Sequence, residues 1–279
     1  MNILQQRAML ARVSVTRWAA NKHDPKVSNE VDVAHGAKNA GKFVKALVDK
    51  SHIKALQTSA GKIRQFHYEM TLPWDDEGDR LLPAKSFQKY TDGLRNLRLE
   101  DEQLQREFIK IYPSLVATAP QRLGTLFDPS DFPDVTELPT KFSMKVDIKP
   151  VPDAEDFRVN VGADAAAEIK KSITADADAK FQAAMKTCYT RMESVVSHIS
   201  KTLKQEDPRI FDTLVTNARD LVECLEDLNI ADDPHLEQLR QDLDAMLPSS
   251  ARALKHNPDL RAKVADEADM ILAKMKGYV

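Results

Sequence analysis

One segment of the chain has residue types and spacing that resemble a phosphate-binding loop. It reads Gly-Ala-Lys-Asn-Ala-Gly-Lys-Phe from Gly36 to Phe43, which matches the spacing G-x-x-x-x-G-K. In nucleotide-binding proteins the next residue is Ser or Thr, whose hydroxyl binds Mg²⁺, and a buried strand precedes the loop. Here Phe43 takes that position and residues 31–35 make a poor strand. We therefore expect no nucleotide site, and interpret the small residues as a face for close helix packing.

Two further groups of residues have the chemistry of metal ligands. Asp75, Glu77 and Asp79 could supply the first oxygen ligands of a calcium loop, but Gly78 then falls at position 4 instead of 6, and Ser86 at position 12 instead of a glutamate. Four histidines lie near the N-terminus without the i, i+4 spacing of a zinc helix: His23, His35, His52 and His67. A looser Mg²⁺ site on the acidic cluster stays open as an alternative. We expect no catalytic, metal or cofactor site, and a solvated acidic turn that caps the following helix.

A basic stripe on a predicted β-strand is the best candidate for ligand binding. Apolar and polar side chains alternate over residues 141–149, which indicates a strand with one buried face. The polar face carries a lysine at every fourth residue, and two arginines on neighbouring strands could join it: Lys141, Lys145, Lys149, Arg158 and Arg12. Such a stripe can follow a phosphate backbone. The strand aromatics belong to the buried face, so base stacking is not expected there, and the alternative is a solvated sheet face.

These strands require a small antiparallel sheet. Residues 157–161 repeat the alternation after a proline-containing loop, which predicts a hairpin with residues 141–149. Residues 12–18 also alternate and are expected to complete a three-stranded sheet.

Long helices are predicted around the strands. Residues 25–49 and 51–70 are helical in composition or periodicity, and residues 84–112 form a heptad seam that is broken once, at Asp101, and should bury Leu94 and Leu97. Residues 163–207 contain no Gly or Pro, and a helix of that length would reach about 65 Å, which favours an elongated protein. Five prolines in residues 113–140 indicate a connector with one short helix near residues 119–127.

Three Asp-Pro or Asn-Pro pairs follow, at residues 207–208, 233–234 and 257–258, and each precedes an apolar stripe. A capping side chain followed by proline is typical of a helix start, which predicts a C-terminal helical bundle. The fold class is therefore mainly α (α+β), with long helices, that bundle and a small antiparallel sheet. We expect two regions, residues 1–162 and 163–279.

The composition is that of a soluble protein, with 42% apolar and 30% charged residues among 279. No signal sequence or membrane span is apparent, and two cysteines without partners suggest reduced thiols, so a cytoplasmic location without membrane attachment is expected. Residues 1–72 carry 12 Lys and Arg against 5 Asp and Glu. Such a basic end is suited to nucleic acid or to the acidic end of another subunit.

A resemblance adds to these observations. The run of residues 66–83, with its core Thr-Leu-Pro-Trp-Asp-Asp-Glu-Gly-Asp-Arg-Leu-Leu-Pro, is similar to a family of uncharacterised proteins of tailed phages and related mobile elements, as are residues 156–161 and 257–261. The resemblance implies a gene near MoxR-type AAA+ ATPases and von Willebrand A-domain proteins, and hence a partner or client of a remodelling ATPase in the host cell. It makes Trp74, Asp76 and Arg80 a candidate interaction motif.

The expected function is that of a non-enzymatic, phage-encoded protein-binding or assembly module. It would associate with itself or with a phage or host protein, through surfaces on its long helices. The alternative is a nucleic-acid-binding accessory protein in phage replication or recombination, which would use the basic N-terminal region and the lysine strand.

Overall fold

The computed structural model describes residues 3–278, and the chain forms two compact units. Unit 1 comprises Met1–Arg12, Tyr68–Tyr90 and Asp147–Val279, and unit 2 comprises Val13–His67 and Thr91–Val146. The fold is mainly α with a small antiparallel sheet, as predicted from the sequence. The boundary that was expected between residues 162 and 163 lies inside unit 1. None of the helices in the described residues has an apolar stretch long enough to span a lipid bilayer.

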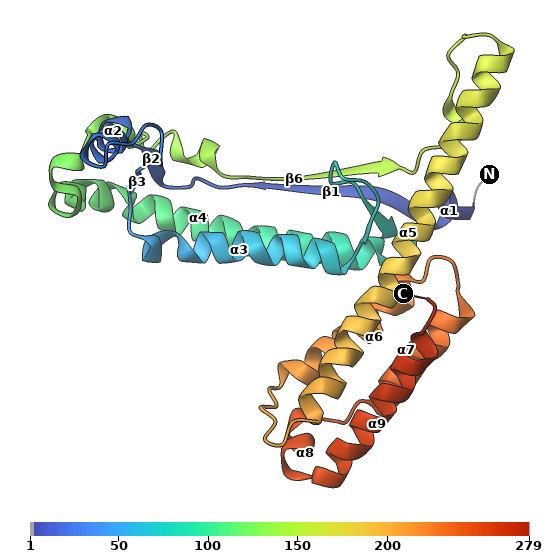
Figure 1. The fold of residues 1–279 in the computed structure, drawn as a ribbon. Helices are drawn as coiled ribbons and strands as arrows, with labels where there is room; N and C mark the ends of the chain where they lie inside the picture. The colour runs from blue at the N-terminus through green and yellow to red at the C-terminus, as the bar shows by residue number, and fades with distance from the viewer. Residues whose placement is uncertain (1–2, 279) are drawn as a thin grey trace. The chain divides into compact units, whose positions relative to one another are not determined.

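The elements follow one another in the order shown in Figure 1, with short 3₁₀ turns between some of them: α1 (Ile3–Arg7), β1 (Ala8–Thr16), β2 (Asn21–His23), α2 (Pro25–Ala34), β3 (Val44–Ala46), α3 (Lys50–Glu69), β4 (Leu72–Pro73), β5 (Arg80–Pro83), α4 (Phe87–Leu123), β6 (Ser143–Pro150), α5 (Ala163–Leu203), α6 (Thr213–Leu228), α7 (Pro234–Met246), α8 (Ala251–His256) and α9 (Pro258–Met275). β1, β6, α3 and α4 each contain residues of both units.

The larger sheet has the strand order β4-β5-β1-β6. Within unit 1, β5 pairs antiparallel with both β1 and β4, so that Leu81 lies opposite Leu10 on one side and Leu72 on the other. β2 and β3 form a second, two-stranded sheet in unit 2. The β4-β5 hairpin was predicted only as a turn, because strands of two and four residues are too short to show a periodic pattern.

The predicted hairpin between residues 141–149 and 157–161 is wrong in its second strand. Residues 157–161 form no strand, and the sheet neighbour of β6 is β1. The alternation in this segment buries little, since Val159 is 62% exposed and Val161 is 45% exposed. Because neither side of this segment is buried, no side-chain packing stabilises an extended strand here.

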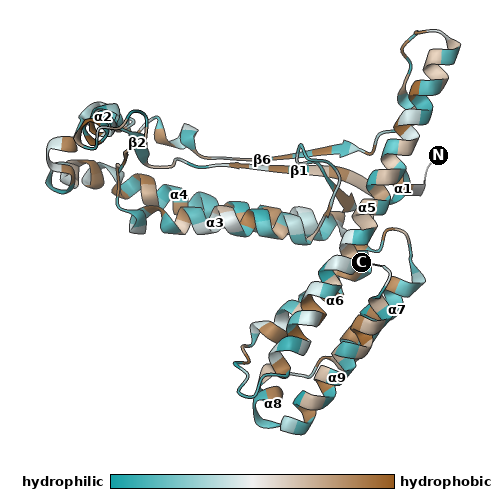
Figure 2. Ribbon diagram, in the orientation of Figure 1, coloured by the Kyte–Doolittle hydropathy of each residue, from teal (hydrophilic) through white to brown (hydrophobic). Residues whose placement is uncertain are grey.

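The helices of unit 1 pack their apolar faces into one core, which contains Ala184, Met192, Leu225, Leu243 and Ala268. Brown and teal segments alternate along α6, α7 and α9 in Figure 2, as expected for helices with one buried face. Two of the three predicted starts are confirmed: the side chains of Asp233 and Asn257 accept backbone N–H bonds at the first turns of α7 and α9. The pair at residues 207–208 starts no helix. α6 begins at Thr213, because Ile210 packs into the core from the preceding loop.

In unit 2, α4 is longer than predicted. It runs through Pro113 and Pro120 to Leu123, where the sequence indicated a connector. The two prolines have no N–H to donate to the carbonyls four residues earlier, so packing has to offset the two lost bonds. Ser114 Oγ donates to the Ile111 carbonyl and Thr118 Oγ1 to the Ser114 carbonyl, which adds hydrogen bonds in this part of the helix. Tyr112, immediately before the first proline, is 2% exposed and its ring centroid lies 5.6 Å from that of Trp18.

The heptad seam is only partly buried. Leu94 is 5% exposed, as predicted, but Leu97 is half-buried and Ile111 is 40% exposed. Asp101, which interrupts the seam, is itself buried. Its side chain is 1% exposed and accepts three hydrogen bonds within unit 2. Its donors are Arg17 Nη2 at 2.5 Å, Ser59 Oγ at 2.8 Å and Gln105 Nε2 at 2.6 Å.

Gly93 marks a close approach of side chain and backbone on α4. A Cβ atom there would lie 2.2 Å from Cζ of Phe66, closer than atoms can approach. We expect Gly93→Ala to lower the free energy of unfolding by about 1–3 kcal/mol through overpacking, reduced by the better helix propensity of alanine. The matched control is Gly61→Ala on α3, where a Cβ meets nothing within 4 Å. It should stabilise the unit by up to about 1 kcal/mol in urea unfolding. Equal gains for both variants would show that the close approach is absent.

Candidate functional site

Two cations of the predicted basic stripe converge on one carboxylate in unit 1. Arg12 Nε lies 2.7 Å from Asp79 Oδ1, and Lys149 Nζ lies 3.2 Å from Asp79 Oδ2. Asp79 is 8% exposed. Burial alone would raise the pKa of its carboxyl group, but the hydrogen bonds from Arg12 and Lys149 bring the pKa below its usual value. The structure thus brings Arg12 and Lys149 together as expected, around a negative charge that the sequence pattern did not place there.

The other members of the stripe are not arranged as predicted. Lys141 ends the 3₁₀ turn Leu138–Lys141 and precedes β6, which begins at Ser143. Lys145 is exposed on β6 within unit 2. Arg158 is exposed in the segment that forms no strand, with Asp156 at 4.0 Å. Of the predicted contacts, two share the single negative charge of Asp79 and two lie outside the strands that were to align them.

The candidate interaction motif is largely buried. Trp74 is 6% exposed in the core of unit 1, and Lys180 lies 5.8 Å from the centre of its ring. Arg80 donates from Nε to Thr71 Oγ1 at 2.8 Å and stacks 4.7 Å from the ring centre of Tyr68. Burial lowers the pKa of Arg80 to about 10. Asp76 is exposed. Trp74 and Arg80 therefore hold the hairpin together, and of the three residues only Asp76 is exposed.

The acidic cluster closes the β4-β5 hairpin and does not cap α4. Asp75 Oδ1 accepts the backbone N–H of Asp79 at 2.9 Å, whereas the turn that leads into α4 has no side-chain cap. In the part of the chain that the structure describes, no three His, Cys, Asp or Glu side chains gather as metal ligands would. Burial raises the pKa of the Cys188 thiol to about 12, which makes it a poor nucleophile.

The segment that resembles a phosphate loop is an exposed loop between α2 and β3. The predicted helix over residues 25–49 ends at Ala34, and a Cβ atom at Gly36 or Gly41 would meet nothing within 4 Å. The helix-packing interpretation is therefore wrong. Local hydrogen bonds hold the loop, since the carboxylate of Asp32 accepts hydrogen bonds from the backbone N–H groups of Asn39 and Ala40. The element immediately before it is helix α2, whereas a phosphate loop follows a buried strand.

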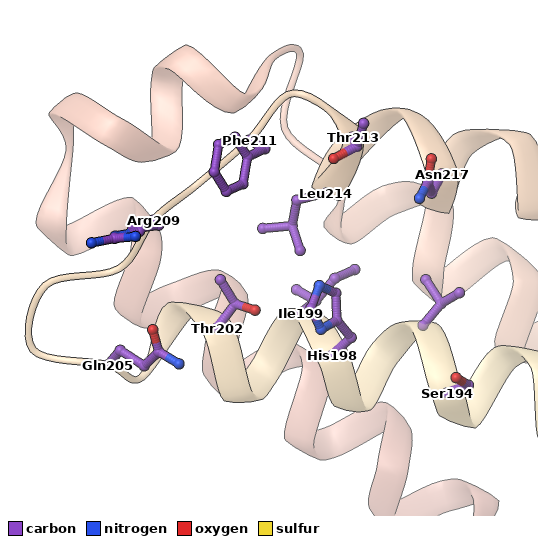
Figure 3. A pocket seen from close by; sticks show the side chains of 11 residues that line it. Ser194, His198, Ile199, Thr202, Gln205, Arg209, Phe211, Thr213, Leu214 and Asn217 are labelled. Atoms are coloured by element: carbon purple, nitrogen blue, oxygen red, sulfur yellow. The ribbon is translucent and has the colours of Figure 1, made fainter. Parts of the chain in front are cut away.

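A groove in unit 1 is the best candidate for a binding site. It has a volume of about 390 Å³ and lies between α5, the loop of residues 204–212 and the start of α6. Val195, Ile199 and Leu214 provide apolar surface within it. Figure 3 shows Phe211 and Leu214 on one side, facing Ile199 and His198 of α5 on the other.

The most exposed apolar side chain of this groove is Phe211, at 65%. The sequence pattern placed it in the apolar stripe of a helix that would start near Pro208. Because α6 starts at Thr213, Phe211 belongs instead to the loop and is left in solvent.

The ionisable residues that line the groove are both basic, His198 and Arg209. Within the described residues, His198 makes no hydrogen bond to Ser194 or to a carboxylate, so no nucleophile and base are paired there. Polar groups from Thr202, Gln205 and Asn217 surround the apolar surface. An apolar centre with a polar and basic rim is suited to a protein partner rather than to bond-breaking chemistry.

Comparison with known proteins finds no match to a protein-family model, a curated protein or a solved structure.

Proposed function

We propose that the protein is a non-enzymatic binding or assembly module that receives an apolar side chain of a protein partner in the α5-α6 groove. The observation that carries the proposal is Phe211, a phenylalanine with 65% of its surface in solvent at the edge of an apolar groove. Exposed aromatic side chains beside apolar pockets are typical binding hot spots. The rim supports the same conclusion, because His198 and Arg209 favour a partner segment with an acidic residue next to its apolar anchor.

The partner we propose is a helix of a MoxR-type AAA+ ATPase encoded near the gene, as the resemblance implies. An amphipathic helix presents an apolar anchor and an acidic residue on one face, at i and i+3 or i+4, which matches the short distance between groove and rim. The alternative partner is a second copy of the chain that binds through the same groove. The experiment below distinguishes this self-association from binding to the ATPase.

The test measures binding of the purified ATPase to the full chain by calorimetry, and the mass of the chain alone by light scattering. Phe211→Ser should weaken ATPase binding about 30-fold or more, the loss that is typical of a hot spot, and should change stability little because the side chain is exposed. Met270→Ser is the matched control, since Met270 is 62% exposed on α9 of the same unit.

Equal binding by wild type and Phe211→Ser would remove the groove from the function. A mass that falls from oligomer to monomer in Phe211→Ser, with no ATPase binding by the wild type, would identify a second copy of the chain as the partner. A wild type that is monomeric and does not bind the ATPase would contradict both partners.

A further inference from the structure

The exposed side of α3 in unit 2 is basic over its whole length. Residues 50–67 contain four Lys or Arg and no Asp or Glu. All four cations are exposed, together with Ser51, Gln57 and Thr58 between them. We call this surface the α3 basic face: Lys50, Lys54, Lys62, Arg64, Ser51, Gln57 and Thr58. From Lys50 to Arg64 it extends about 21 Å along the helix.

In the described part of the chain, the cations of the α3 basic face have no carboxylate partner, unlike some cations on other helices. Elsewhere, Arg95 pairs with Asp92 at 2.8 Å and Lys180 with Asp176 at 2.7 Å on their own helices. Within the described residues, none of the four cations on α3 makes an ion pair. Arg64 donates to the Val15 carbonyl at 2.8 Å, which orients the guanidinium without cancelling its charge. A row of cations interleaved with hydroxyl and amide groups has the chemistry that binds phosphate oxygens.

The hydrophobic side of α3 is fully used inside unit 2. Ile53, Leu56, Ala60 and Ile63 are each at most 5% exposed. A helix that binds a membrane surface needs exposed apolar side chains beside its lysines, and the exposed side of residues 50–67 has none larger than Ala55. Its exposed residues include no Phe, Tyr or Trp on which unpaired bases could stack, and the one exposed ring is the imidazole of His52. Both facts favour a duplex, which is held through its backbone.

We propose that the α3 basic face binds the phosphate backbone of double-stranded nucleic acid without reading its sequence. A shallow groove of about 440 Å³ beside the face is lined by Lys54, Thr58 and Lys62 on one side and by Glu100 of α4 on the other. Glu100 limits the surface, because its carboxylate repels phosphates. The proposal does not depend on the Phe211 groove, which belongs to unit 1 and concerns a protein partner.

The test measures binding of a fluorescent 20-base-pair DNA duplex to the full chain by anisotropy at several salt concentrations. With about four phosphate contacts, the wild-type affinity should fall about 100-fold between 50 and 200 mM salt. Changing Lys50, Lys54, Lys62 and Arg64 to Gln should weaken binding at least about tenfold at low salt. It should also reduce the magnitude of the slope of log K against the logarithm of the salt concentration by about three to four. Glu100→Gln should strengthen binding.

Two control variants remove positive charge elsewhere. Changing Arg95, Arg98, Arg106 and Lys110 on α4 to Gln removes the same charge from the same unit. Changing Lys141, Lys145 and Lys149 to Gln removes the lysines of the predicted strand. Both should bind nearly as the wild type does. Equal weakening by the α3 and α4 variants, absence of salt-dependent binding, or tighter binding to anionic lipid vesicles or single strands than to the duplex would overturn the proposal. Circular dichroism would confirm that the α3 variant, whose changes are all on exposed residues, is folded.

Discussion

Asp101→Ala should lower the free energy of unfolding of unit 2 by about 3–5 kcal/mol, the range observed when one member of a buried ion pair is removed. The carboxylate is 1% exposed and the Arg17 side chain is 9% exposed, so the variant leaves a buried guanidinium without its counter-charge. Ser59 and Gln105 lose their acceptor at the same time. Urea unfolding can be followed by Trp18, which packs in unit 2, in a Trp74→Phe background.

Two further variants separate the ion pair from general disruption. Glu100→Ala, one residue away on the exposed side of α4, should change the stability by no more than about 0.5 kcal/mol. The double variant Arg17→Leu and Asp101→Leu should recover much of the loss, because it removes both buried charges. Arg17 Nε is itself buried without a hydrogen-bond partner, which makes such recovery more favourable. A loss below about 1 kcal/mol in Asp101→Ala would show that the seam at this point is open to water.

The elements that the sequence predicts well are those whose stabilisation is local. α7 and α9 begin at the expected prolines, because the capping side chains of Asp233 and Asn257 act within a few residues. α5 begins at Ala163 as predicted, although Gly162 provides no side-chain cap, and its residues contain neither Gly nor Pro. The elements that the sequence did not predict depend on contacts between residues that are far apart in the chain. The β4-β5 hairpin depends on pairing between β5 and β1, which are about 70 residues apart in the chain. α4 continues through two prolines where Tyr112 and Ala119 are buried, and Tyr112 packs against Trp18 from a distant part of the chain.

For the candidate sites too, the sequence identified the residues but not the contacts that they make in the fold. The sequence identified the cations of the basic stripe but could not show that Asp79, from a loop that looked merely acidic, would pair with Arg12 and Lys149. The excess of positive charge in residues 1–72 was visible, but the burial pattern was needed to show that four of its cations lie on the exposed face of α3. Phe211 was assigned to a buried stripe, because moving the helix start by a few residues changes which side chains face the core.

Trp74, in the candidate interaction motif, offers the second large effect. Trp74→Ala should lower the free energy of unfolding of unit 1 by about 3–5 kcal/mol, as large-to-small changes at buried tryptophans do. Trp74 is 6% exposed and shares a core with Leu72 and Leu81, so its removal leaves a cavity beneath the hairpin. Thermal unfolding followed by far-ultraviolet circular dichroism measures the loss, since the remaining Trp18 reports on unit 2 alone.

Asp76→Ala is the matched control within the same motif. Asp76 is exposed, so the change should shift stability by no more than about 0.5 kcal/mol. If Trp74 served a partner instead of the core, Trp74→Ala would leave the melting temperature unchanged and weaken binding. The opposite pattern is expected, because Trp74 packs inside unit 1 and Arg80 is bonded to Thr71 of the same hairpin. The motif would then mark the residues that this hairpin needs in order to fold, and its exposed turn, which includes Asp76 and Glu77, would be where it can meet another molecule.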